Sequence, residues 1–109
     1  MTESFMGAGA PADASEAVVL GAALATVYGD RHPQASGAPA AIRSASRRLA
    51  RFAGNYDFDI DAPFATWLRH IADGGDVNTA RADAEGNRRR ITSAIGAIVD
   101  RGAMPVLLG

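Results

Sequence analysis

Apolar and polar positions alternate along the chain in blocks that predict strands separated by helices. Residues 17–21 are continuously apolar and include two valines, which is typical of a strand covered on both faces. Residues 105–108 form a second run of this kind, and residues 68–73 are a further strand candidate between the two. The pattern therefore predicts three short strands.

Two stretches carry apolar residues at steps of three and four, the period of a helix with one buried face. They predict helices over residues 39–52 and 87–101, and Gly102 suits the left-handed position that ends the second helix. Strands that alternate with helices favour an α/β fold, in which helices pack on a parallel sheet. The carboxyl ends of the strands, near Gly21, Asp73 and Gly109, should then share one edge of the sheet. The apolar stripe of the first helix contains Ala38, Ile42, Ala45, Leu49 and Phe52.

Length and composition indicate one domain in the cytoplasm. The first 15 of the 109 residues are small and polar and predict a flexible lead-in, which leaves 16–109 for the domain. The chain has no cysteine, which excludes disulfides and thiolate metal sites. A net charge of −1 provides no field that would gather nucleic acid or an anionic membrane, so we expect neither as a partner. There is also no secretory signal and no apolar run of membrane-spanning length.

A row of arginines lies along the first predicted helix at four-residue spacing. A nucleic-acid groove binder would use such a row, but acidic residues follow closely and no aromatic residues are interleaved. We therefore interpret the row as a solvated, structural face. Its members are Arg43, Arg47, Arg48 and Arg51.

The alternating aspartates of residues 57–61 match the opening of a calcium-binding loop. The match then fails, because Ala62 stands where the loop needs glycine and Leu68 where it needs glutamate. We reject a calcium site here.

Two places hold residues of the types that line sites. His70, Asp73 and Asp76 lie within seven positions, but strand alternation would direct His70 and Asp73 to opposite faces, which disfavours a metal site. We instead interpret 73–76 as the carboxyl-end rim of a parallel sheet, where ligands of open α/β folds collect. The long connection 22–37 carries Tyr28 and His32, and long ordered loops are often functional. An exposed loop histidine without a role is the alternative for His32.

Five segments, taken in their order and spacing, resemble the N-terminal third of a ureohydrolase, a protein of the arginase and agmatinase family. Within that family the chain looks most like the agmatinase-type members, over roughly residues 17–109. The segments are 19–21 (VLG), 28–33 (YGDRHP), 38–46 (APAAIRSAS), 73–77 (DGGDV) and 102–109 (GAMPVLLG).

This resemblance implies a fold, a reaction and a cofactor. The fold would be part of a three-layer α/β/α sandwich around a parallel sheet, with the first strand between the other two. Members of the family hydrolyse guanidino groups with two manganese ions, and agmatinases convert agmatine and water to putrescine and urea. The complete protein would then act on a guanidino small molecule, with manganese, and would form a homo-oligomer.

The same resemblance assigns no catalytic residue and no metal ligand to this chain. The earliest metal ligand of the family follows the third strand in a Gly-Gly-Asp-His motif, and Gly109 matches its first glycine. Asp73 and Asp76 match framework positions of the site, whereas Tyr28 and His32 would belong to the substrate-side loop. One departure is Ala23, where the family often has proline.

We therefore expect a truncated ureohydrolase that, on its own, neither binds manganese tightly nor hydrolyses agmatine. The alternative is a small non-catalytic α/β binding module that uses the loop 22–37 as its binding surface.

Overall fold

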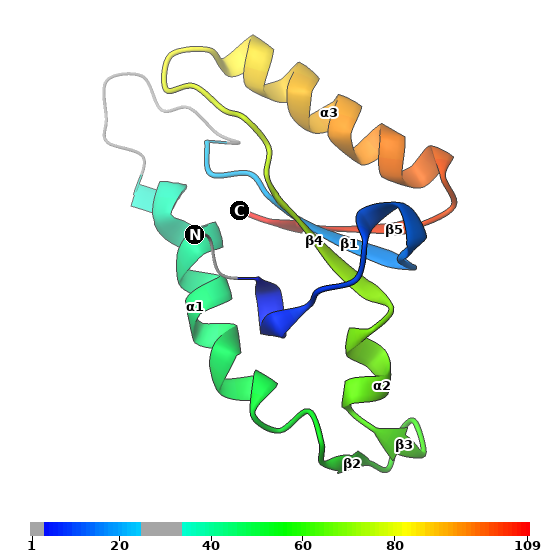
Figure 1. Cartoon of the computed structure of the whole chain (residues 1–109). Helices are drawn as coiled ribbons and strands as arrows, with labels where there is room; N and C mark the ends of the chain where they lie inside the picture. The colour runs from blue at the N-terminus through cyan, green and yellow to red at the C-terminus, as the bar shows by residue number, and fades with distance from the viewer. Residues whose placement is uncertain (1–3, 25–33) are drawn as a thin grey trace.

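The computed structural model describes residues 4–24 and 34–109. Within these ranges a small parallel sheet lies between two helices (Figure 1). None of the helices there is long and apolar enough to cross a membrane. The elements, in chain order, are η1 (Phe5–Gly7), η2 (Ala12–Ala14), β1 (Ala17–Gly21), η3 (Gln34–Gly37), α1 (Ala38–Ala50), β2 (Tyr56–Asp57), β3 (Ala62–Pro63), α2 (Ala65–Leu68), β4 (Ile71–Asp76), α3 (Ala84–Asp100) and β5 (Met104–Leu108).

The main sheet has the strand order β4-β1-β5, and both pairings are parallel. The α/β class and the central position of the first strand are thus confirmed. Gly21 at the end of β1 pairs with Asp76 on one side and with Leu108 on the other, so the carboxyl ends of the three strands share one edge. The β1–β4 register shifts between Val19 and Gly21, where β4 contains one extra residue, so Asp76 lies level with Gly21, the position that Gly75 would hold in an unshifted ladder.

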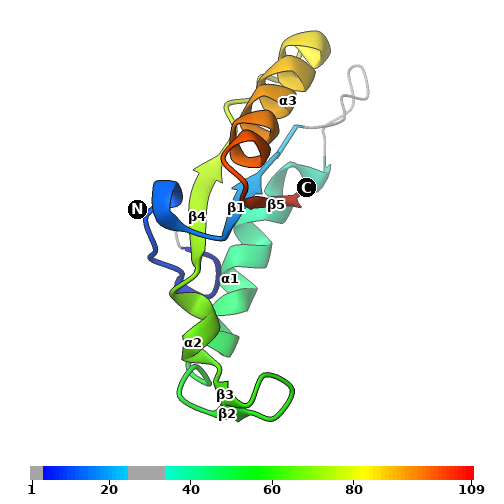
Figure 2. The same ribbon diagram turned by 90° about the vertical axis from the view of Figure 1, so that its right-hand side faces the viewer.

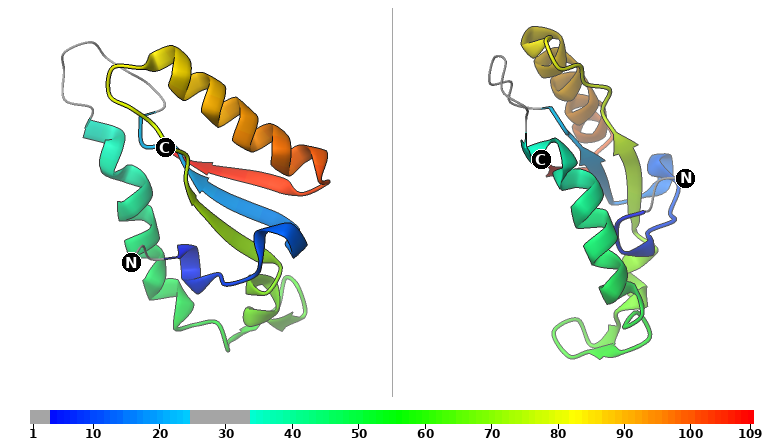
Figure 3. Two further views of the ribbon diagram at one scale, coloured as in Figure 1. Left: turned by 45° about the horizontal axis from the view of Figure 1, so that its top comes forward. Right: turned by 90° about the vertical axis from the view of Figure 1, so that its left-hand side faces the viewer.

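Helix α3 covers one face of this sheet (Figure 3). Val18, Leu20 and Ala72 point to that face and form the core with Ile98 of α3. The helix starts three residues before the predicted position, at Ala84, because the Asp83 carboxylate caps it by accepting a hydrogen bond from the Gly86 N–H. Its end agrees with the prediction, since Gly102 has the left-handed φ of 83°.

Helix α1 covers the opposite face, but with a different side from the one predicted. Its buried residues are Pro39, Arg43 and Ser46. The predicted apolar stripe is turned outward, and Leu49 and Phe52 are 51% and 45% exposed. The interpretation of the arginine row as a solvated face is wrong for Arg43, which is 1% exposed. The reason is that the facing strand presents a carboxylate, which an arginine satisfies and an apolar stripe does not.

The second strand lies later than the predicted 68–73. Trp67 and Leu68 belong to the short helix α2, and His70 closes that turn by donating its backbone N–H to the Trp67 carbonyl at 3.0 Å. Strand β4 begins only at Ile71 and continues through both glycines to Asp76. Asp73 therefore lies within the strand, and Asp76 is the residue at its end.

The acidic link between α1 and β4 forms a two-residue antiparallel pair, β2 with β3. This hairpin lies at the end of the molecule away from α3 (Figure 2). It is separate from the main sheet, in which every pairing is parallel.

Residues 4–16, within and just after the expected lead-in, pack against the rest of the molecule. They contain two 3-10 turns, η1 beside α1 and η2 beside β4 (Figure 1). Met6, Ala8 and Ser15 are buried.

Candidate functional site at the carboxyl ends of β1 and β4

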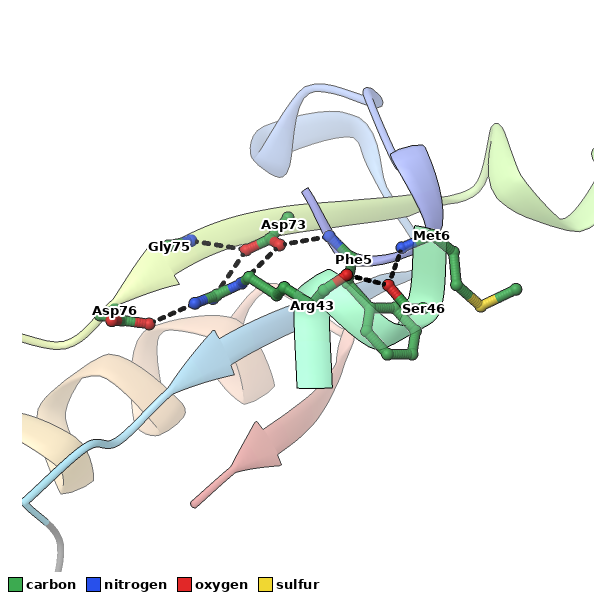
Figure 4. Close-up of polar contacts among 7 residues, drawn as sticks. All are labelled: Phe5, Met6, Arg43, Ser46, Asp73, Gly75 and Asp76. Atoms are coloured by element: carbon green, nitrogen blue, oxygen red, sulfur yellow. Dashed lines mark hydrogen bonds and ion pairs between the residues drawn. The ribbon is translucent and has the colours of Figure 1, made fainter. Parts of the chain in front are cut away.

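Arg43 is the centre of the polar cluster between α1 and β4 (Figure 4). Its Nε donates to Oδ2 of Asp73 at 2.8 Å, and its Nη2 donates to Oδ1 of the same carboxylate at 3.0 Å. Its third nitrogen, Nη1, donates to Oδ1 of Asp76. Burial alone would lower the pKa of Arg43, but the hydrogen bonds to the two aspartates outweigh it and raise the pKa. The guanidinium is therefore permanently charged and bridges two carboxylates on one strand.

Asp73 has every acceptor position of its carboxylate engaged. Besides the two bonds from Arg43, the Phe5 N–H donates to Oδ2 at 2.7 Å and the Gly75 N–H donates to Oδ1 at 2.9 Å. Burial would raise the pKa of this carboxyl, but the hydrogen bonds from Arg43, Phe5 and Gly75 favour the ionised form and lower the pKa below its usual 3.8. A carboxylate that accepts four hydrogen bonds has no lone pair left for a cation. Asp73 thus anchors α1 and the N-terminal segment to β4.

Asp76 differs from Asp73 because it lies at the open end of the sheet. Its side chain is 45% exposed, and Arg43 holds it from one side. Gly21 makes this position possible: a Cβ there would collide with the Asp76 carboxylate and would lie 2.9 Å from Cβ of Pro39. The lack of a side chain at Gly21 is therefore what lets Asp76 reach Arg43.

Ser46, one turn after Arg43, ties the N-terminal segment to α1. Its hydroxyl donates to the Arg43 carbonyl at 2.7 Å and accepts from the Met6 N–H at 2.8 Å. Ser46 is 6% exposed, so the hydroxyl is satisfied entirely within the protein.

Another buried polar residue, Asn87, organises the same end of the sheet from the α3 side. It is 0% exposed, and its amide nitrogen donates to the carbonyls of Leu24 at 3.1 Å and Ala80 at 2.8 Å. Its amide oxygen accepts from the Ala80 N–H at 2.7 Å and from Nη2 of Arg90 at 2.8 Å. Asn87 thus joins the start of α3 to the chain that leaves β1 and to the link after β4.

Sequence reasoning missed Arg43, Ser46 and Asn87. Arg43 looked like one member of an arginine row, and Asn87 looked like the polar start of a helix. The available signal for Arg43 was its position four residues after Pro39, which places it one turn along on the same helix face. Nothing in the sequence around Asn87 distinguishes it from an exposed helix-start residue.

The structure brings together only part of the predicted site. Asp73 and Asp76 are joined through Arg43, whereas Tyr28 and His32 lie outside the described residues. His70 is not on the strand, and its Nδ1 lies 3.6 Å from Oε1 of Glu16, with the imidazole 46% exposed. His70 therefore takes no part in the cluster.

The described residues do not fit a two-manganese centre. Within ranges 4–24 and 34–109, no three carboxylate or imidazole side chains converge as a metal site would need. Asp73 is saturated by hydrogen bonds, and Asp76 shares its carboxylate with a guanidinium. The arrangement can hold a strand end and a helix in a fixed relation, and it presents one partly exposed carboxylate at the rim.

Comparison with known proteins supplies the family. The sequence model of the Arginase family matches residues 15–109, which is most of the chain. The match includes α1, β4 and β5, and therefore the whole of the Arg43, Asp73 and Asp76 cluster. A comparison with curated proteins finds no match. The parallel sheet, with α1 and α3 on opposite faces, agrees with this assignment, and the chain belongs to the Arginase family.

Proposed function

We propose that this chain is the N-terminal part of a manganese-dependent amidinohydrolase of the agmatinase type. The reaction would be the hydrolysis of agmatine to putrescine and urea. The observation that carries the proposal is the Arg43 bridge, which holds Asp76 at the shared carboxyl end of β1 and β4. Ligands of parallel α/β sheets bind at this edge, and the family match covers every residue of the bridge.

The role we assign to the described residues is to build the rim. In a ureohydrolase, a bound pair of manganese ions would supply the Lewis acidity that makes water a nucleophile at neutral pH. The donors in this chain do not match such a centre, so its ligands have to come from other residues. Asp73 and Arg43 fix the end of β4, and Asp76 contributes negative charge that favours a cationic guanidino substrate nearby.

The exposed apolar surface supports the N-terminal position within a larger domain. Leu49 of α1 and Phe52 in the turn after it are 51% and 45% exposed, and Val106 and Leu107 of β5 are 38% and 43% exposed. Apolar surface of this kind on a helix and on the neighbouring edge strand is usually covered by further protein. In a three-layer sandwich, additional strands beside β5 and additional helices beside α1 would cover both.

The test is a urea-release assay on two polypeptides, with manganese present. One is the 109-residue chain, and the other is the product of the same reading frame with any codons that continue it. We expect urea from agmatine only with the longer product, and slower release from arginine or guanidino acids. In the longer product, Asp76→Asn should raise KM for agmatine, because one negative charge near the cation is lost, whereas Arg88→Ala on the exposed side of α3 should leave the kinetics unchanged.

Three results would count against the proposal. Turnover of agmatine by the 109-residue chain alone would mean that the catalytic site lies within these residues. A longer product that hydrolyses no guanidino compound would rule out the proposed reaction. A reading frame that stops directly after Gly109 would remove the N-terminal position and leave the small binding module as the better hypothesis.

A further inference from the structure

Residues 4–14 contact both sides of the sheet, although they precede the residues that match the Arginase family. On the α1 side, the Phe5 N–H reaches Asp73 and the Met6 N–H reaches Ser46 (Figure 4). On the α3 side, Ala10 packs against the core cluster. Arg101 at the end of α3 then donates to the Asp13 carbonyl at 3.4 Å.

The backbone of this segment is bent into a conformation that its neighbours must hold. Met6 has φ 53° and ψ 21°, which is left-handed and unfavourable for a residue with a side chain, and Gly7 follows with φ 74°. Met6 is nevertheless buried, with only 8% of its surface exposed. A strained residue that is also buried persists only where surrounding contacts fix it, and the contacts here are the two hydrogen bonds to Asp73 and Ser46.

The contact with Asp73 connects the segment to the bridge at the sheet edge. Oδ2 of Asp73 accepts from both Phe5 and Arg43, so the segment and the guanidinium share one oxygen. Removing the Phe5 N–H would leave that oxygen with one donor fewer, beside a pair whose side chains are 1% and 6% exposed.

We propose that residues 4–14 form a strap, latched by Asp73 and Ser46, that seals the Arg43–Asp73 pair from water and thereby holds Asp76 in place at the rim. The strap is a conformational device of this chain, and the proposal does not depend on guanidino hydrolysis. Release of the strap would loosen the bridge while the β1–β5 ladder stays intact, because within the described part of the chain no hydrogen bond joins residues 4–14 to β5.

A matched pair of variants in the full chain isolates the latch. Phe5→Pro removes the N–H that Asp73 accepts, and Phe5→Ala removes the ring but keeps the N–H. Proline suits this position, since it is the first residue of a 3-10 turn and Ser4 before it is extended at ψ 145°. The readout is hydrogen exchange by NMR at Nε–H of Arg43 and at the Gly75 amide, both of which donate to Asp73.

We expect both protons to exchange about tenfold faster in Phe5→Pro than in Phe5→Ala, which is the size expected for losing a hydrogen bond to a charged group. The Leu20 amide, in the centre of the sheet, should exchange equally in the two variants. Equal rates at Arg43 in both variants would overturn the proposal. The proposal would also be overturned if Phe5→Pro accelerated exchange at Leu20 as much as at Arg43, because the whole domain would then be opening.

A reversible cross-link provides the second measurement and does not require Phe5 to be changed. A Cβ built on Gly7 would lie 3.8 Å from Cβ of Ala50, which is within the range of disulfides, and the chain has no other cysteine. In Gly7→Cys/Ala50→Cys, oxidation should slow exchange at Arg43 Nε–H relative to the same protein after reduction. The backbone strain that cysteine introduces at position 7 is present in both the oxidised and the reduced protein, so it does not affect the comparison between them. Exchange that does not change on oxidation would show that the strap does not control access to the pair.

Discussion

Arg43 and Asp73 meet as a forked pair between α1 and β4, with Nε to Oδ2 at 2.8 Å and Nη2 to Oδ1 at 3.0 Å. Two parallel bonds from a planar guanidinium fix direction as well as distance, so they set the rotation of α1 about its own axis. This explains why α1 buries Arg43 and Ser46 and leaves its apolar stripe half-exposed.

The first prediction concerns this pair. Arg43→Met should lower the free energy of unfolding by about 3–5 kcal/mol, because it leaves the buried Asp73 carboxylate without its cation. Arg43→Lys should lower the free energy of unfolding by less, since an ammonium keeps the charge but cannot form the two parallel hydrogen bonds. Denaturant unfolding measures both. The control is Arg48→Met on the exposed side of the same helix, which should change stability by less than about 0.5 kcal/mol. Equal losses for Arg43→Met and Arg48→Met would show that the fork does not stabilise the domain.

The second prediction concerns acid. The pKa of Asp73 is lower in the folded chain than its usual 3.8, so the folded state prefers the ionised form. The stability from this preference is fully present above about pH 4 and is lost as the pH falls through the lower, folded-state pKa. Arg43 stays protonated throughout, and the Phe5 and Gly75 N–H groups do not titrate. In Asp73→Asn the loss of stability below pH 4 should be shallower than in the unmodified chain, as measured by thermal unfolding at a series of pH values. Parallel curves would contradict the assignment to Asp73.

The third prediction compares two glycines. Gly21→Ala should destabilise the fold by about 1–3 kcal/mol, because the new methyl group meets the Asp76 carboxylate and Pro39. Gly96→Ala, at a position in α3 where the added Cβ would meet no described residue outside its own stretch of helix, should stabilise it by up to about 1 kcal/mol through helix propensity. Thermal unfolding of the two variants measures both changes in stability and their opposite signs. A neutral Gly21→Ala would mean that Asp76 does not need the space it occupies here.

The fourth prediction concerns Asn87. Asn87→Ala should cost about 2–3 kcal/mol, since it removes the partners of the Ala80 N–H and of the carbonyls of Leu24 and Ala80 in a fully buried site. Asn87→Asp keeps the acceptor of the Ala80 N–H and of Nη2 of Arg90 but loses both donors, so it should also destabilise the fold because it brings a negative charge to two carbonyls. If Asn87→Asp were neutral, the two donor bonds would have no importance for stability.

The fifth prediction concerns the edge of β5. The Met104 N–H bonds to the Glu16 carbonyl and the Leu108 carbonyl bonds to the Ala22 N–H, so alternate residues from 104 to 108 face β1. The backbone groups of Pro105 and Leu107 therefore face away from the sheet, and within the described ranges β5 pairs with β1 alone. Pro105 has no N–H to offer, which leaves the Leu107 N–H as the outward donor of the strand.

We expect the 109-residue chain to self-associate through this edge, as measured by light scattering. Leu107→Pro should reduce the association without breaking the β1–β5 ladder. Val106→Pro should unfold the chain, because its N–H belongs to that ladder. A monodisperse monomer before any substitution would show that the edge is covered.

The predictable part of the fold depended on local pattern. The short apolar run of 17–21 and the position of Gly102 are encoded by neighbours in sequence, and both agree with the structure. The parallel arrangement followed from the alternation of strands and helices, since parallel strands need crossovers. The second strand was misplaced because Trp67 and Leu68 have the composition of a strand, whereas a one-turn helix satisfies their backbone.

The sequence by itself determined the class of fold, the order of the three main strands and the two long helices, and the family resemblance, because each follows from periodicity or from short motifs. Only the tertiary structure decided which face of α1 is buried, since that depends on a carboxylate thirty residues away along the chain. It also decided that Asp73 is an anchor and that Asp76 is the partly exposed residue at the rim. The physical reason is that burying a charge is favourable only beside its partner, and the partner is identified by spatial proximity.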